Sequence, residues 1–284
     1  MLMKAVLICP GERPEVPLLQ MESPLALAPA LGYGVVEYWM SHLACAGARQ
    51  VVLLANDRPD EVRKLIGDGA RWGLATEVIA ESRELTPEHA AEKYGAAATA
   101  MDHLPGLPDH PLFASYERWF GALATWMPRA RPPDRVGVRE LHPGIWVGLH
   151  CQISREARLC APCWLGDHVY VGPGAVVGPE AILENGAFVE PTAEIRGSVV
   201  GPATFVGQFV RINNSLAFGN TLVNWQTGLE NKVSDAFLLC SLRPRRQSQG
   251  AKAVAWLGRA TDWLARWKED RPLAPQSILL KKGS

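Results

Sequence analysis

The chain has 284 residues, more than the roughly 150 expected of one domain, so two domains are the first expectation. Hydrophobic residues make up 48% and charged residues 20%, a balance that excludes a largely disordered protein. Lys plus Arg and Asp plus Glu number 29 each, so no net charge attracts nucleic acid, and we expect no such partner. The short apolar start and irregularly spaced cysteines predict a cytoplasmic protein without disulfides.

The first 85 residues alternate between strand and helix signals. Apolar, β-branched runs bounded by Pro or Gly indicate strands, and Pro59 and Gly67 frame a helix as helix-start and helix-stop residues do. The predicted elements in chain order are strand 4–9, helix 34–46, strand 50–55, helix 59–66 and strand 77–80. This alternation predicts a three-layer, Rossmann-like α/β domain with a parallel sheet over residues 1–85.

Residues 86–140 are predicted to form a helical connector. One helix is expected over 88–100, behind Thr86 and Pro87, and a second over 113–127. One face of the second helix is apolar and carries Phe113, Tyr116, Phe120, Leu123 and Met127. An aromatic stripe at helical spacing favours packing in a core over ligand binding.

A six-residue repeat begins near residue 145. A Val, Ile or Leu occurs at every sixth position: Val147, Ile153, Leu159, Leu165, Val171, Val177, Leu183, Val189 and Ile195. A fixed hexad of one short strand and one turn predicts a parallel β-helix over 141–240, in which stacked coils bury one aliphatic column. After Ile195 the spacing slips by one and resumes at Val200, Val206, Ile212 and Phe218, so we expect a small loop or bulge near Gly197 and Ser198.

The repeat resembles that of the hexapeptide-repeat proteins, and the resemblance implies that the β-helix is left-handed. Many members transfer acyl groups from acyl-CoA and use a histidine as base. The best candidate here is His168, which follows Asp167. The alternative interpretation of His168 is a solvated histidine at a corner of the coil. A zinc site made from His150, Cys151, Cys160 and Cys163 is not expected, because the repeat separates these side chains.

The first half also resembles the sugar-phosphate nucleotidyltransferases, which join a sugar 1-phosphate to a nucleoside triphosphate. The resemblance lies in Lys4-Ala5-Val6, Gly11, Pro17-Leu18, Glu37-Tyr38 and the segment 67–73. It implies that Gly11 belongs to a phosphate-binding loop. Many of those enzymes carry a left-handed β-helix after the transferase domain, so the two halves of the chain agree.

The sequence departs from the nucleotidyltransferase pattern at positions where those enzymes carry Arg or Lys. Arg13 and Glu15 stand where those enzymes have a second Gly and an Arg, and Leu25 follows Pro24 where they have a Lys. Between Ala80 and the β-helix no predicted strand ends in a Gly-Asp pair, so the metal-binding Asp is expected to be missing. Nucleotidyl transfer needs positioned positive charge and Mg²⁺. The resemblance therefore implies a truncated, catalytically degenerate domain, with Gly11 and Arg13 as residual phosphate contacts and no metal site.

The tail, residues 241–284, is basic and amphipathic. It begins with Arg243, Arg245 and Arg246 and continues into a predicted helix with Trp256 and Trp263 on its apolar side. Such a helix is expected to dock on the β-helix or form an oligomer interface, and contact with a membrane surface or a protein partner is the alternative.

The leading hypothesis from sequence is a nucleotidyltransferase-like binding or scaffold protein in cell-surface polysaccharide and nucleotide-sugar metabolism. It has a nucleotide sugar and a protein partner as expected ligands, and it forms a homo-oligomer. One alternative is an acyltransferase acting on a nucleotide sugar with acyl-CoA as donor. Another is an active sugar-1-phosphate nucleotidyltransferase that uses Mg²⁺ with its nucleotide. The sequence leaves open whether the chain is an enzyme.

Overall fold

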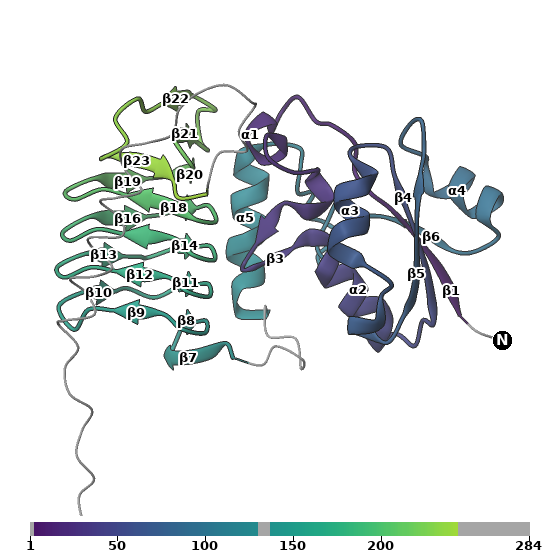
Figure 1. The fold of residues 1–284 in the computed structure, drawn as a ribbon, viewed down its shortest axis with the longest axis horizontal. Coiled ribbons are helices and arrows are strands. Elements are labelled where there is room, and N and C mark those ends of the chain that lie inside the picture. Colours follow the sequence, from purple (N-terminus) through teal and green to yellow (C-terminus); the bar gives the residue numbers. More distant parts are fainter. Residues whose placement is uncertain (1–2, 130–136, 244–284) are drawn as a thin grey trace, which may run out of the picture. The chain divides into compact units, whose positions relative to one another are not determined.

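The computed structural model describes residues 3–129 and 137–243 (Figure 1). The predicted C-terminal helix lies outside the described residues. Among the helices that are described, none is long and apolar enough to cross a membrane.

Four parallel strands form the N-terminal sheet, in the order β5 (Ala75–Ala80), β4 (Gln50–Ala55), β1 (Lys4–Ile8) and β6 (Ala98–Ala100). Helices α2 (Val35–Cys45) and α3 (Pro59–Ile66) lie on one face of the sheet and α4 (Pro87–Tyr94) on the other (Figure 1). Because successive strand residues point to opposite faces, Leu7 belongs to the core beneath α2 and α3, whereas Val6 and Ile8 pack toward α4. The predicted parallel α/β sheet is confirmed.

The predicted helix over 88–100 is wrong in its second half. Helix α4 ends at Tyr94, and Gly95 takes a left-handed conformation (φ 63°) that stops it. The chain then returns to the sheet, and Ala98–Ala100 pairs in parallel with β1. Residues 86–140 are therefore not a purely helical connector, because they supply a strand beside β1.

The remaining elements of the first half are short except for helix α5, which has 11 residues. They are α1 (Pro17–Gln20), η1 (Leu25–Leu27), β2 (Pro29–Ala30), β3 (Tyr33–Gly34), η2 (Ala70–Trp72), α5 (Tyr116–Trp126) and η3 (Met127–Arg129). Ser115 caps α5 by accepting a hydrogen bond from the Arg118 amide. The apolar stripe predicted for this helix is buried, as expected.

From Ile145 onward, short strands recur in a cycle of three and stack into three sheets (Figure 1). The strands are β8 (Ile145–Val147), β9 (Gln152–Ile153), β10 (Arg158–Leu159), β11 (Cys163–Leu165), β12 (Tyr170–Val171), β13 (Val176–Val177), β14 (Ala181–Leu183), β15 (Phe188–Val189), β16 (Glu194–Arg196), β17 (Val199–Val200), β18 (Thr204–Val206), β19 (Arg211–Asn213) and β20 (Ser215–Phe218). Each strand from β8 to β17 pairs in parallel with the strand three places later, as Leu165 of β11 does with Leu183 of β14. This arrangement is compatible with a β-helix.

Antiparallel strands extend two of these sheets. Strand β7 (Arg139–His142) pairs with β8, β21 (Thr221–Asn224) lies between β20 and β22 (Glu230–Lys232), and β23 (Leu239–Ser241) pairs with β18.

The hexad residues form one buried column, with two corrections. The slip after Ile195 is a corner shortened to Gly197 and Ser198, not an added loop or bulge, so that Val200 still pairs with Leu183. A second slip follows, because Val200 pairs with Ala217. Ala217 is thus the inward residue, and Phe218 packs instead on the core of the first half.

The sheet that contains β8, β11, β14, β17 and β20 turns its outer face toward the α/β layers. Its outward side chains share one buried cluster with α5: Trp146, Trp164, Ile182, Val199, Leu216, Trp119, Phe120 and Leu123. This shared core joins the two halves of the described chain.

Candidate functional site

The carboxyl ends of β1, β4, β5 and β6 lie at the same edge of the parallel sheet, where ligands bind in open α/β folds. The segment after β1 carries Gly11 and Arg13, the two residues predicted from the sequence. The segment after β5 carries Glu84, and Asp102 follows β6. The structure therefore brings the predicted pair together with two acidic residues that the sequence analysis did not identify.

Glu84 accepts hydrogen bonds from both residues that were predicted to contact phosphate. Its Oε2 accepts from the Gly11 amide at 2.9 Å and from Arg13 Nη1 at 2.8 Å, and its Oε1 accepts from Arg13 Nη2 at 2.7 Å. A bidentate guanidinium with an added backbone N–H is a typical arrangement for holding an anion. Here the anion is a side chain of the chain itself.

The charges of this pair are mutually stabilised. Burial raises the pKa of Glu84, but the hydrogen bonds from Arg13 and from the Gly11 amide outweigh burial and lower the pKa below its ordinary value. The hydrogen bond to Glu84 raises the pKa of Arg13. Burial, followed by the charge of Glu84, raises the pKa of the nearby Cys9 thiol to about 12, so this thiol is a poor nucleophile.

The loop is held in place by further contacts. The Arg13 amide donates to Gln20 Oε1 and Gln20 Nε2 donates to the Arg13 carbonyl, both at 2.9 Å. A Cβ at Gly11 would lie 2.8 Å from Asn56 Nδ2 and 3.1 Å from Glu84 Oε2, so glycine leaves room for the ends of these two side chains beside the loop. Asn56 Oδ1 is buried beside it and has no hydrogen-bond partner in residues 3–129 and 137–243.

Asp102 bears on the expectation that the metal-binding Asp is missing, because it follows a strand, β6, that the sequence did not predict. The sequence has Met101-Asp102 rather than Gly-Asp, and no strand was predicted before it, so Asp102 was overlooked. The Asp102 carboxylate is hydrogen-bonded to His103 Nδ1 at 2.6 Å. The negative charge of Asp102 contributes to the raised pKa of Arg13. Among the described residues, no group of three or more His, Cys, Asp or Glu side chains is placed to hold a metal ion.

A third carboxylate that the sequence did not reveal, that of Glu184, joins the two halves. Glu184 follows β14 and is completely buried, and its oxygens accept from the amides of Leu31 and Gly32, each at 2.7 Å. The neighbouring Asn185 donates to the Gly32 carbonyl at 2.8 Å. The hairpin formed by β2 and β3 is thus fixed against a corner of the coiled strands.

His168 lies far along the chain from this site, at an exposed corner of the coiled strands. It has a positive φ of 57° and stacks on His150, with ring centroids 5.0 Å apart. Asp167 does not orient the imidazole, because its carboxylate accepts from the Leu149 amide at 2.7 Å. The cysteines considered for zinc are also occupied otherwise, since Cys163 is buried inside and Cys151 Sγ donates to the Gly166 carbonyl.

No protein-family model matches the chain. The chemistry of the Gly11 loop is therefore inferred from its geometry. An arginine and a backbone amide that are already bound to a carboxylate cannot stabilise a triphosphate unless Glu84 moves away.

Proposed function

We propose that the chain is a nucleotidyltransferase-like protein whose catalytic site is degenerate, and that it acts in the cytoplasm as a binding or scaffold protein in cell-surface polysaccharide and nucleotide-sugar metabolism. The observation that carries the proposal is the position of Glu84 on the Gly11 amide and the Arg13 guanidinium. Transferases need those donors for phosphate oxygens, and a permanent carboxylate there opposes triphosphate binding by charge and by occupancy.

The second half supports the scaffold role. We infer that its stacked strands form a left-handed β-helix, which is a rigid unit. The buried Glu184 contact and the shared core under α5 hold the α/β half on this unit. Self-association through the β-helix or the C-terminal tail, and a protein partner in polysaccharide synthesis, belong to the same proposal.

A second candidate function, nucleotidyl transfer with a rearranged site, is favoured by Asp102. It stands at the end of β6, beside β1, where a carboxylate can bind one metal ion together with substrate phosphates. For this candidate, Glu84 has to leave Arg13 when nucleotide binds. Acyl transfer has no such support, because Asp167 is hydrogen-bonded away from His168.

The test is a thermal-shift titration of the full chain with nucleoside triphosphates and nucleotide sugars, with and without Mg²⁺, combined with a pyrophosphate-release assay on sugar 1-phosphates. The proposal predicts no Mg²⁺-dependent shift with triphosphates and no pyrophosphate, since binding to the native state would raise its stability. A Mg²⁺-dependent shift with pyrophosphate release, both lost in Arg13→Ala and Asp102→Asn, would establish the second candidate instead.

A further inference from the structure

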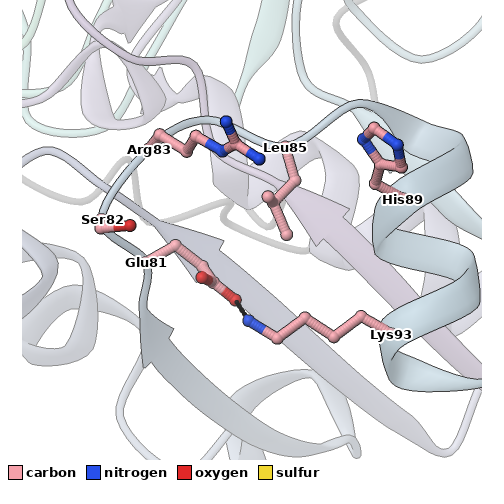
Figure 2. Close-up of a pocket in the computed structure, with 6 residues that line it drawn as sticks. All are labelled: Glu81, Ser82, Arg83, Leu85, His89 and Lys93. Atoms are coloured by element: carbon pink, nitrogen blue, oxygen red, sulfur yellow. Dashed lines mark hydrogen bonds and ion pairs between the residues drawn. The ribbon is translucent and has the colours of Figure 1, made fainter.

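A cavity of about 340 Å³ lies on the α4 side of the first domain, apart from the Gly11 loop. Its walls come from the segment after β5 and from one face of α4 (Figure 2). The lining residues are Glu81, Ser82, Arg83, Leu85, His89 and Lys93. Its volume is in the range of roughly 300–1,000 Å³ that is common for small-molecule sites.

The acidic residue of the cavity is already neutralised. Glu81 Oε1 accepts a hydrogen bond from Lys93 Nζ at 2.7 Å and another from the hydroxyl of Tyr94. The hydrogen bond from Lys93, followed by that from Tyr94, lowers the pKa of Glu81, and the bond to Glu81 raises the pKa of Lys93. Lys93 is therefore held as a fixed ammonium at the cavity, and an ammonium has three N–H donors.

The other two basic residues have free head groups. Neither Arg83 nor the His89 ring has a hydrogen-bond or ion-pair partner within residues 3–129 and 137–243. Figure 2 shows their side chains on either side of Leu85, with the Glu81–Lys93 pair on the remaining side. Three basic side chains thus surround one cavity whose only carboxylate is paired, and the cavity has an excess of positive charge.

We propose that this cavity binds a small phosphate-bearing molecule. Arg83 supplies a planar fork that matches two phosphate oxygens, and Lys93 supplies a charged donor whose position Glu81 fixes. The hydroxyl of Ser82 is a further donor, and Leu85 offers an apolar surface to the organic part of the molecule.

This site is separate from the Gly11 loop, and the inference does not rest on the proposed function. Glu84 lies between Arg83 and Leu85 in the chain, but its carboxylate binds Gly11 and Arg13 and does not line the cavity. Within the segment 81–85, Glu84 therefore belongs to the Gly11 loop, whereas Arg83 and Leu85 line the cavity.

The probes for the test are inorganic phosphate and phenyl phosphate, with phenol as the uncharged counterpart. Each is titrated at constant ionic strength into the full chain labelled with ¹⁵N, and backbone amide shifts are followed. We expect saturable shifts at residues 81–85 and 89–93 with both phosphates and none with phenol. Arg83→Gln should weaken binding about fivefold or more, because a charged hydrogen-bond pair is lost.

The matched control is Arg155→Gln, which removes an exposed arginine on the coiled strands. It should leave the affinity unchanged. The inference is overturned if the shifts do not saturate, or if Arg83→Gln and Arg155→Gln weaken binding equally, which would indicate attraction to net charge alone. Shifts confined to Gly11–Arg13 and Glu84 would also overturn it and would place the anion in the other loop.

Discussion

At the residue scale, the decisive contact joins Arg13 to a carboxylate 71 positions away. The sequence analysis identified Gly11 and Arg13 because their spacing after the first strand is a local pattern. Glu84 and Asp102 were missed because nothing near them in the sequence marks them. Only the parallel pairing of β1 with its neighbours brings their segments to one edge of the sheet.

This contact predicts a pH dependence of stability. The pKa of Glu84 is lowered in the folded state, so its contribution is fully present above the unfolded value of about 4.3 and is lost as the pH falls through the folded value. The side chains of Arg13 and Glu84 are 31% and 27% exposed, so solvent screening limits the contribution to about 1–2 kcal/mol. Glu84→Gln should therefore be less stable than the parent in urea at pH 7, and the difference should shrink as the pH falls below about 4.3 and through the lowered folded-state pKa of Glu84.

Glu77→Gln is the control for that comparison, because the side chain of Glu77 is exposed and has no hydrogen-bond partner in the described part of the chain. It should stay within about 0.5 kcal/mol of the parent at every pH. A difference between Glu84→Gln and the parent that did not shrink as the pH fell below about 4.3 would show that the effect does not come from the carboxylate charge.

At the scale of elements, the sequence predicted most strands and helices but not how all of them pair. β4 and α3 have the bounds expected, and the hexad column is buried because a fixed period imposes the same environment on each repeat. β6 was taken for helix because its residues are mostly alanine, and parallel pairing with β1 overrode that local preference. Ala217 occupies the inward position that was predicted for Phe218, because a one-residue slip in the repeat moves every later side chain to the other face.

Glu184 gives the element-scale prediction. Glu184→Gln replaces one acceptor oxygen by an NH₂ group that faces the Leu31 and Gly32 amides, so one buried N–H loses its partner. We expect a loss of about 2–3 kcal/mol in the free energy of unfolding, measured in urea. Glu156→Gln, at an exposed corner of the same coiled strands, should cost less than about 0.5 kcal/mol. Equal losses in the two variants would contradict the role assigned to Glu184.

At the scale of the whole described chain, the two halves share one core, so they should unfold together. The ring of Phe120 in α5 stacks on Trp225 with centroids 4.6 Å apart, and Trp225 Nε1 donates to the Gly197 carbonyl at 2.7 Å. The sequence predicted an apolar face for α5 but not its partner, because the outward positions of the repeat follow no strict rule.

Phe120→Ala tests this shared core. We expect a loss of about 3 kcal/mol with a single calorimetric transition in both the parent and the variant. Phe209→Ala removes a ring that is 70% exposed, and it should shift the transition little. Two separate transitions in the parent protein would show that the halves are independent and would contradict the shared core.

The central claim is that Glu84 occupies a phosphate position, and anion rescue of Glu84→Ala tests it most directly. Thermal stability is measured for three proteins: the parent, Glu84→Ala and Asp60→Ala. Asp60→Ala is the control and removes the exposed partner of Arg63. Each protein is measured in phosphate and in chloride at equal ionic strength. Binding at the α4 cavity affects all three proteins alike and cancels in the comparison. The account predicts that phosphate stabilises Glu84→Ala more than the other two, by about 2.7 kcal/mol when phosphate is a hundredfold above its Kd. An equal response to phosphate in all three proteins would contradict the account, since Gly11 and Arg13 would then not form an anion site that Glu84 fills.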